Sequence, residues 1–235
     1  MVPIPLHDHI RRQTIPVFTF LLIAANILAF LAELRLRGQI DEVVFYLGII
    51  PARYTVPQIA LEQSASGLIT PLFASMFLHG GWLHLAGNML FLFVFGRSIE
   101  DRFGHWRFFL LYFLGGLTGS LLHIVLNADS LVPSIGASGA VAGVLGAYFI
   151  TYPRARITTL VPILFFFWMV QIPALALLGY WFLLQFLSGF QMQAIESATQ
   201  GGVAWWAHVG GFAAGFVLAL LFRPKRRRVT EVMEM

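Results

Sequence analysis

The run WRFFLLYFLGGLTGSLLHIVLN, Trp106–Asn127, holds a single Lys, Arg, Asp or Glu side chain, Arg107. A helix needs about 20 mostly apolar residues to cross the hydrocarbon core of a bilayer, so this run predicts a membrane-spanning helix. Similar apolar runs flank it in both directions along the chain. These further runs are Ile15–Ala32, Leu83–Ser98, Ala137–Tyr152, Thr158–Leu187 and Val203–Phe222. We therefore predict an all-α, polytopic membrane protein built as a bundle of six transmembrane helices.

The composition is typical of a protein whose surface is covered mainly by lipid. Of 235 residues, 58% are hydrophobic and only 11% are charged, whereas a soluble domain carries about a quarter charged residues. The formal net charge of +4 could indicate nucleic-acid binding, but the basic residues lie between the apolar runs, where membrane topology explains them. Cysteine is absent from the sequence, which excludes disulfide and thiolate chemistry. We expect no cofactor, no metal and no nucleic-acid partner.

The basic residues also predict the orientation of the bundle. With the N-terminus inside and six crossings, every Lys and Arg falls on the inner side except Arg35, Arg37 and Arg53. This bias predicts that both termini are inside, and that a large first loop, partly helical, lies outside at the membrane interface. The expected divisions are a short cytoplasmic N-terminal stub (1–14), a six-helix domain (15–222) and a basic cytoplasmic tail (223–235).

A few polar side chains interrupt the apolar runs, where they are costly and therefore point to function. Ser138 opens the fourth run, His208 lies in the sixth, and His84 and Asn88 share one face of the second. The predicted orientation places them at a similar depth near the outer side. The fourth run has about 16 residues, or roughly 24 Å, against a hydrocarbon core of about 30 Å. Its outer end with Ser138 should therefore be recessed in a wet cavity.

Small residues predict that the fourth and sixth helices approach each other closely. Gly139 and Gly143 lie on one ridge of the fourth helix, and Gly211 and Gly215 form a G-x-x-x-G pair on the sixth. Small residues allow helix backbones to pack closely in lipid. If these two seams face each other, His208 is carried toward the serine.

The constellation predicts nucleophilic catalysis. The hydroxyl of Ser138 is a weak nucleophile until a base removes its proton, and His208 is the candidate base. Because no Asp or Glu lies within the fourth or sixth run, the sequence favours a Ser–His dyad over a triad with a carboxylate. The side chains of His84 and Asn88, together with the backbone N–H of Ser138, are the expected donors to the oxyanion.

Other interpretations of these residues are possible. A serine near a glycine at a helix start is usually a cap or a packing residue, and a membrane histidine is as often structural as functional. A transporter would favour paired carboxylates or broken helices at the midplane. A metal site built from His79, His84 and His208 would leave Asn88 and Ser138 unexplained. The conjunction of all four residues in separate runs favours catalysis.

The motifs resemble those of the rhomboid family. The stretch SMFLHGGWLHLAGNML at 75–90 resembles its second-helix H-x-x-x-N motif, and GASG at 136–139 resembles its G-x-S-G motif. The stretch AHVGGFAAG at 207–215 resembles A-H-x-x-G-x-x-x-G, and Gly96, Glu100 and Gly104 resemble a structural G-x-x-x-E-x-x-x-G element. Two features depart from patterns found in some members: Ala142 replaces an aromatic residue under the histidine ring, and Thr70-Pro71 replaces a Trp-Arg pair.

This resemblance implies an intramembrane serine endopeptidase with a catalytic dyad of Ser138 and His208 and an oxyanion hole served by His84, Asn88 and Ser138. It implies cleavage of single-span membrane proteins in or near their transmembrane segment, with substrate access beside a mobile fifth helix and the loop Ser188–Gly202. The alternative is a rhomboid-like protein that binds membrane clients without cutting them. A compact chain of this kind suits a bacterial plasma membrane; the sequence names neither a substrate nor an oligomeric state.

Overall fold

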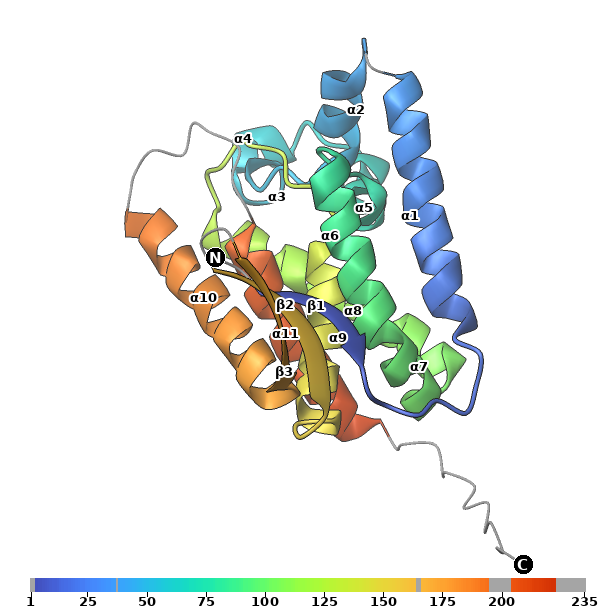
Figure 1. Ribbon diagram of the computed structural model, residues 1–235. Coiled ribbons are helices and arrows are strands. Elements are labelled where there is room, and N and C mark those ends of the chain that lie inside the picture. Colours follow the sequence, from blue (N-terminus) through green and yellow to red (C-terminus); the bar gives the residue numbers. More distant parts are fainter. Residues whose placement is uncertain (1–2, 37, 164–165, 195–203, 223–235) are drawn as a thin grey trace, which may run out of the picture.

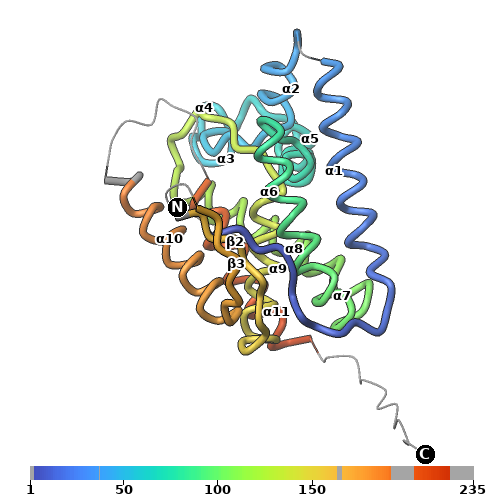
Figure 2. The backbone as a smooth tube through the Cα atoms, in the orientation of Figure 1, coloured from blue at the N-terminus to red at the C-terminus, as the bar shows by residue number. Residues whose placement is uncertain are grey.

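The computed structural model describes residues 3–36, 38–163, 166–194 and 204–222, most of which are helical. Figures 1 and 2 show α1 (Val17–Arg35) on one side of the bundle and α10 (Ala174–Ala194) on the other. Within these described ranges, four helical segments are long and apolar enough to cross a membrane, and three shorter helices are apolar. The four are Val17–Arg35, Trp82–Phe103, His105–Leu126 and Ala174–Gln191. The prediction of a mostly helical chain is confirmed, whereas six spans and their orientation stay predictions.

The first loop is partly helical, as predicted. It contains short helices and one 3₁₀ turn that leads toward the second span. These are α2 (Ile40–Leu47), α3 (Ala52–Thr55), α4 (Pro57–Ala60), α5 (Ala65–Ala74) and the turn η1 (Ser75–Phe77). The side of the membrane on which this loop lies stays a prediction.

The second and third spans are joined by a tight turn. The second consists of α6 (Trp82–Phe91), a π-helical turn (Leu92–Gly96) and α7 (Arg97–Phe103), and α8 (His105–Leu126) follows. Gly104 between them has a φ of 83°, a left-handed conformation that favours glycine. The predicted run Trp106–Asn127 differs from α8 by one residue at each end, whereas Leu83–Ser98 ends before α7 does, at Ser98 instead of Phe103.

The centre of the bundle is α9 (Ser138–Thr151), and α8 and α11 (Trp205–Leu221) pack against it. Every residue from 139 to 148 of α9 is buried. A helix of 14 residues is about 21 Å long. Its length agrees with the short fourth helix expected from the sequence, and protein rather than lipid covers most of its surface.

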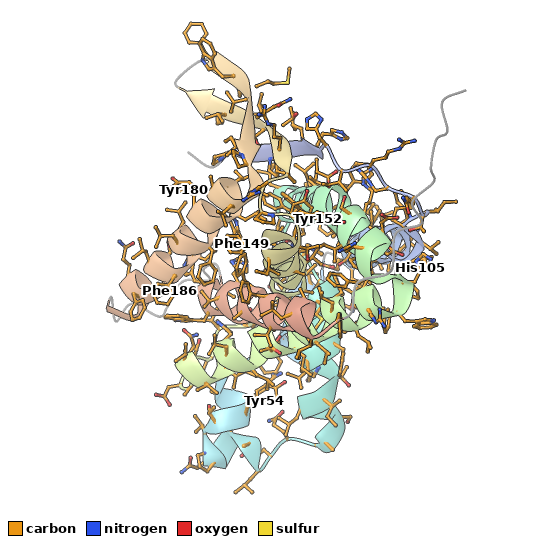
Figure 3. The ribbon with its side chains drawn as sticks, turned by 90° about the horizontal axis from the view of Figure 1, so that it is seen from below. Tyr54, His105, Phe149, Tyr152, Tyr180 and Phe186 are labelled. Atoms are coloured by element: carbon orange, nitrogen blue, oxygen red, sulfur yellow. The ribbon has the colours of Figure 1, made fainter. Side chains whose placement is uncertain are left out.

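The all-α prediction is wrong at a three-stranded antiparallel sheet. The strands are β1 (Ile4–Asp8), β2 (Arg156–Ile163) and β3 (Phe166–Pro173), in the order β1-β2-β3. β2 and β3 occupy the first half of the run that we expected to be one helix, Thr158–Leu187, so that α10 begins only at Ala174. This half is rich in β-branched and aromatic residues, and its two prolines disfavour a helix interior. Seen from below, the β2–β3 hairpin extends away from the helices (Figure 3).

The N-terminal segment, expected to be a stub, is fastened to the bundle through Asp8. This fully buried carboxylate accepts hydrogen bonds from the hydroxyls of Ser98 and Tyr148, the latter at 3.1 Å, and forms an ion pair with Arg12. The flanking His7 and His9 are exposed. Strand β1 therefore belongs to the folded domain.

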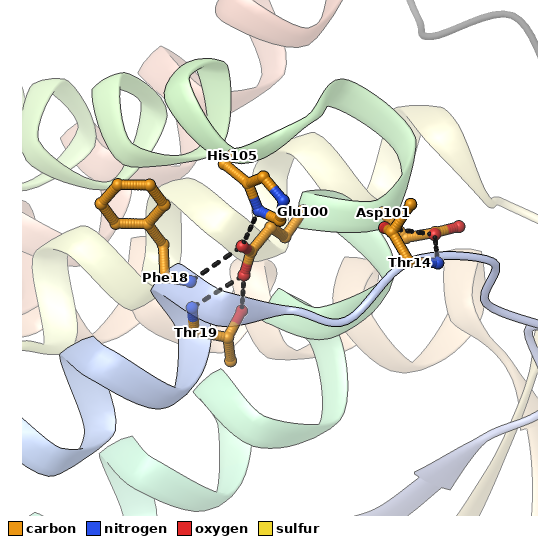
Figure 4. A network of polar contacts seen from close by, with 6 residues as sticks. All are labelled: Thr14, Phe18, Thr19, Glu100, Asp101 and His105. Atoms are coloured by element: carbon orange, nitrogen blue, oxygen red, sulfur yellow. Dashed lines mark hydrogen bonds and ion pairs between the residues drawn. The ribbon is translucent and has the colours of Figure 1, made fainter.

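A second carboxylate, Glu100, holds the start of α1. It is fully buried and accepts hydrogen bonds from the backbone N–H groups of Phe18 and Thr19 at 2.8 and 2.7 Å (Figure 4). It also accepts one from the Thr19 hydroxyl at 2.7 Å and contacts His105 Nδ1 at 2.5 Å. The N–H groups in the first turn of a helix lack intrahelical acceptors, and a carboxylate there satisfies them. Glu100 thus joins α7 to α1, the structural role that the sequence suggested.

Candidate active site

The serine proposed as nucleophile is the first residue of α9. Gly136, two residues before Ser138, has a φ of 128°, and a Cβ placed on it would lie 2.7 Å from the His84 ring. Its backbone N–H donates to the carbonyl oxygen of Ser75 at 2.8 Å. The local sequence therefore needs glycine here, both for the backbone conformation and for the close approach of His84. Because Ser138 begins the helix, its own N–H has no intrahelical acceptor.

The glycine seams of α9 and α11 face each other. A Cβ on Gly211 would lie 2.0 Å from the carbonyl oxygen of Gly139, and one on Gly215 would lie 1.8 Å from that of Gly143. A Cβ on Gly139 would in turn lie 3.5 Å from the carbonyl oxygen of Ala207. Since Ser138 precedes Gly139 and His208 follows Ala207, the two helices bring these two residues to the same level of the bundle.

His208 is buried and its ring nitrogen Nδ1 is already engaged. It lies 2.7 Å from Oε1 of Gln185, which projects from α10 and is also buried. The Trp181 ring, one turn earlier on α10, lies with its centroid 5.8 Å from that of the imidazole. This leaves Nε2 as the nitrogen available to the serine. In the part of the chain that the structure describes, no hydrogen bond joins Ser138 to His208; the dyad stays a prediction.

The two residues Gln185 and Trp181 were missed in the sequence. The fourth and sixth runs hold no Asp or Glu, whereas Gln185 is an uncharged polar residue within the apolar part of α10. The side-chain amide within an apolar helix is the sequence signal for Gln185, because a buried amide needs a hydrogen-bond partner.

The two proposed side-chain donors to the oxyanion lie on α6. Asn88 is buried, and its Nδ2 has no hydrogen-bond partner among the described residues. The His84 ring faces Gly136, two residues before the serine, and meets the ring of His79 edge-on with the centroids 5.1 Å apart. An unpaired buried donor is costly to fold, which makes it a candidate for a charge that appears only during a reaction.

A small pocket opens beside the serine. Its lining includes Ser138, Gly136, Ser75, His123 and Ala207, which come from α9, α8, α11 and the turns before α6 and α9. The lining mixes polar and apolar residues, and His84, Asn88 and His208 are not among the lining residues. The wet cavity around the serine stays a prediction.

A metal centre finds no support in the described part of the chain. Within residues 3–36, 38–163, 166–194 and 204–222, no three His, Cys, Asp or Glu side chains are arranged to hold an ion. His79 instead interacts with protein groups: its backbone N–H donates to Glu33, and its Nδ1 lies 3.2 Å from the carbonyl oxygen of Phe77. Burial, with the nearby His84 as a lesser cause, lowers the pKa of His79 to about 4.

Comparison with known proteins gives one family. The family model described as Rhomboid domain matches residues 66–225, which include all the candidate site residues. The matched stretch begins in α5 and extends beyond α11.

Curated relatives carry the same family name. RHOMBOID-like protein 5 of Arabidopsis thaliana is 35% identical over 66% of this chain and 45% of its own length. Rhomboid protease GluP of Bacillus subtilis is 38% identical over 56% of this chain and 24% of its own. Rhomboid protein 1, mitochondrial, of Saccharomyces cerevisiae is 31% identical over 75% of this chain and 49% of its own. The matches thus span half or less of these relatives.

Proposed function

This chain belongs to the rhomboid family, and on that premise we propose that it is an intramembrane serine endopeptidase. Its substrates are single-span membrane proteins, which it cleaves in or near the transmembrane segment. The observation that supports this proposal is the close packing of Gly139 on Ala207, since Ser138 adjoins the first of these residues and lines a small pocket, and His208 adjoins the second.

The proposed reaction has two halves. His208 Nε2 takes the proton of the Ser138 hydroxyl as Oγ attacks the peptide carbonyl carbon. The carbonyl oxygen of the peptide becomes an oxyanion, and it accepts hydrogen bonds from the side chains of Asn88 and His84 and from the backbone N–H of Ser138. The C–N bond then breaks, and the imidazolium protonates the leaving amine. In the second half, water gives a proton to His208 and attacks the acyl ester, and the serine leaves with that proton.

The membrane setting of the proposal rests on the apolar helices and on the family. Both indicate an integral membrane protein. We propose that substrate enters beside α10, whose outer face is largely exposed. We further propose that the host membrane is a bacterial plasma membrane and that both termini lie inside. The distribution of Lys and Arg supports this orientation.

The test uses the full chain in lipid vesicles with a single-span reporter. Ser138→Ala and His208→Ala should each abolish cleavage while the protein stays folded. Ser120→Ala is the matched control, because Ser120 is a buried serine lining the same pocket. Undiminished cleavage by Ser138→Ala ends the protease proposal. Binding of the reporter by the unmodified chain without any cleavage would establish the non-proteolytic alternative instead.

A further inference from the structure

We propose that Gln185 is a positioning residue for His208, a neutral third member of the site that stands where soluble serine proteases place a carboxylate. This inference rests on the proposed function, in which His208 is the base. It concerns a residue of α10 that lies 23 positions before the histidine in the sequence.

The hydrogen bond has the geometry of an orienting contact. Gln185 Oε1 lies 2.7 Å from His208 Nδ1, and the two residues are only 7% and 8% exposed. An amide oxygen accepts, so this contact holds the tautomer with its proton on Nδ1 and leaves the lone pair on Nε2. Only that tautomer can take the proton of Ser138. Gln185 therefore fixes both the orientation of the ring and the nitrogen that acts as the base.

Trp181 supports the same ring from the same helix. The plane of the Trp181 ring is tilted by 36° from the plane of the His208 ring, and the ring centroids are 5.8 Å apart. Trp181 and Gln185 are four residues apart and so share one face of α10. The ring contact and the hydrogen bond to His208 therefore both come from α10.

The contacts continue along α10 toward its C-terminus. A Cβ on Gly189, one turn beyond Gln185, would lie 3.0 Å from the ring of Trp206, which is two residues before His208. One face of α10 is thus fitted against the start of α11. Because substrate is proposed to pass beside α10, the helix that borders the path also carries the acceptor that orients the base.

The neutral amide makes a distinct prediction about charge. A carboxylate beside an imidazole stabilises the imidazolium, whereas an amide oxygen orients the ring with much less stabilisation of its charge. Other titratable groups near His208 are His84 on α6 and His123 on α8, and neither supplies a negative charge. Replacing Gln185 by Glu should therefore keep the acceptor and shift the pH dependence of the reaction, while replacing it by Met should remove the acceptor.

The experiment compares Gln185→Met, Gln185→Glu and the control Gln191→Met, an exposed glutamine on the same helix. The full chain is assayed in vesicles for reporter cleavage across pH and for labelling of Ser138 by a fluorophosphonate, which reports activation of the serine without a peptide substrate. For Gln185→Met we expect a fall in kcat of about 10- to 100-fold, with KM within about twofold and labelling slowed in parallel. For Gln185→Glu we expect a kcat at least tenfold higher than that of Gln185→Met. We also expect the acid limb of its pH–rate profile to lie at higher pH than that of the unmodified chain.

The proposal is overturned if Gln185→Met labels and cleaves as the unmodified chain does. It is also overturned if Gln185→Glu is as slow as Gln185→Met with an unmoved acid limb. Should the Met variant melt at a lower temperature, the folded Glu variant decides the question through its pH profile. Failure of the proposed function is seen separately, as an unmodified chain that neither labels at Ser138 nor cleaves.

Discussion

Gly211 of α11 rests directly on the carbonyl oxygen of Gly139 in α9, since a Cβ on Gly211 would lie only 2.0 Å from that oxygen. The atom in the way belongs to the backbone, so no side-chain rotation can relieve the overlap. The distance between the two helices, and with it the distance between the proposed nucleophile and base, depends on this absence of a side chain.

Gly211→Ala should therefore separate α9 from α11. We expect it to lower the free energy of unfolding by about 1–3 kcal/mol through overpacking, and to reduce fluorophosphonate labelling of Ser138 in the molecules that remain folded. Gly87→Ala on α6 is the matched control, because a Cβ there meets nothing within 4 Å. Equal stability and equal labelling of the two variants would show that the glycine contact does not set the helix spacing.

Asn88→Ala should slow cleavage more than it affects folding. The Asn88 amide nitrogen has no partner among the described residues, so its removal breaks no hydrogen bond in the resting protein. Loss of one oxyanion donor lowers turnover by about ten- to a thousandfold. The measurement is kcat for the reporter together with the melting temperature. A loss confined to expression or melting temperature would make Asn88 a structural residue.

The buried His79 should make stability depend on pH. Its pKa is lowered by burial from 6.5 to about 4, so the unfolded chain takes up the proton first as the pH falls. The free energy of unfolding should thus be highest above about pH 6.5 and should decline as the pH falls toward about 4. His79→Gln should weaken this decline, and the exposed His7→Gln should leave it unchanged. The check is unfolding at a series of pH values; identical slopes for all three proteins would contradict it.

Glu100→Ala should loosen the start of α1. The substitution leaves the N–H groups of Phe18 and Thr19 and the Thr19 hydroxyl without their acceptor. We expect a loss of about 2–4 kcal/mol in the free energy of unfolding. Cleavage per folded molecule should be unchanged, because Glu100 lies in α7 and touches none of the proposed site residues. A variant of normal stability would mean that water or another side chain replaces the carboxylate.

Much of the helical framework could be predicted because a long apolar run in a membrane must satisfy its backbone hydrogen bonds internally, and a helix does so. Trp106–Asn127 and α8 (His105–Leu126) differ by one residue at each end. The prediction of one helix over Thr158–Leu187 is wrong because hydrophobicity alone does not separate a strand from a helix. Its first half forms β2 and β3, and this outcome depends on pairing with Ile4–Asp8, a contact between distant parts of the chain.

The candidate site was predictable where motif and helix face coincide, as for Gly139 and Gly211. It was not predictable for Gln185, since the register of α10 against α11 is a tertiary feature that depends on side chains such as Phe182, whose ring lies 4.6 Å from that of Phe212. Gln185 is also neutral, so the distribution of charged residues along the sequence does not point to it.

The open sheet also limits how deep the molecule can sink. Strand β3 lies at the edge of the sheet order, and its side chains from Phe166 to Met169 are well exposed. Unpaired N–H and C=O groups in hydrocarbon cost roughly several kcal/mol each, so this edge must stay where water or lipid headgroups can reach it. Trp168 suits that boundary, since tryptophan favours the headgroup level. We therefore expect the exposed edge of the hairpin to lie where water or lipid headgroups reach it, and this position would limit how deeply the bundle is immersed.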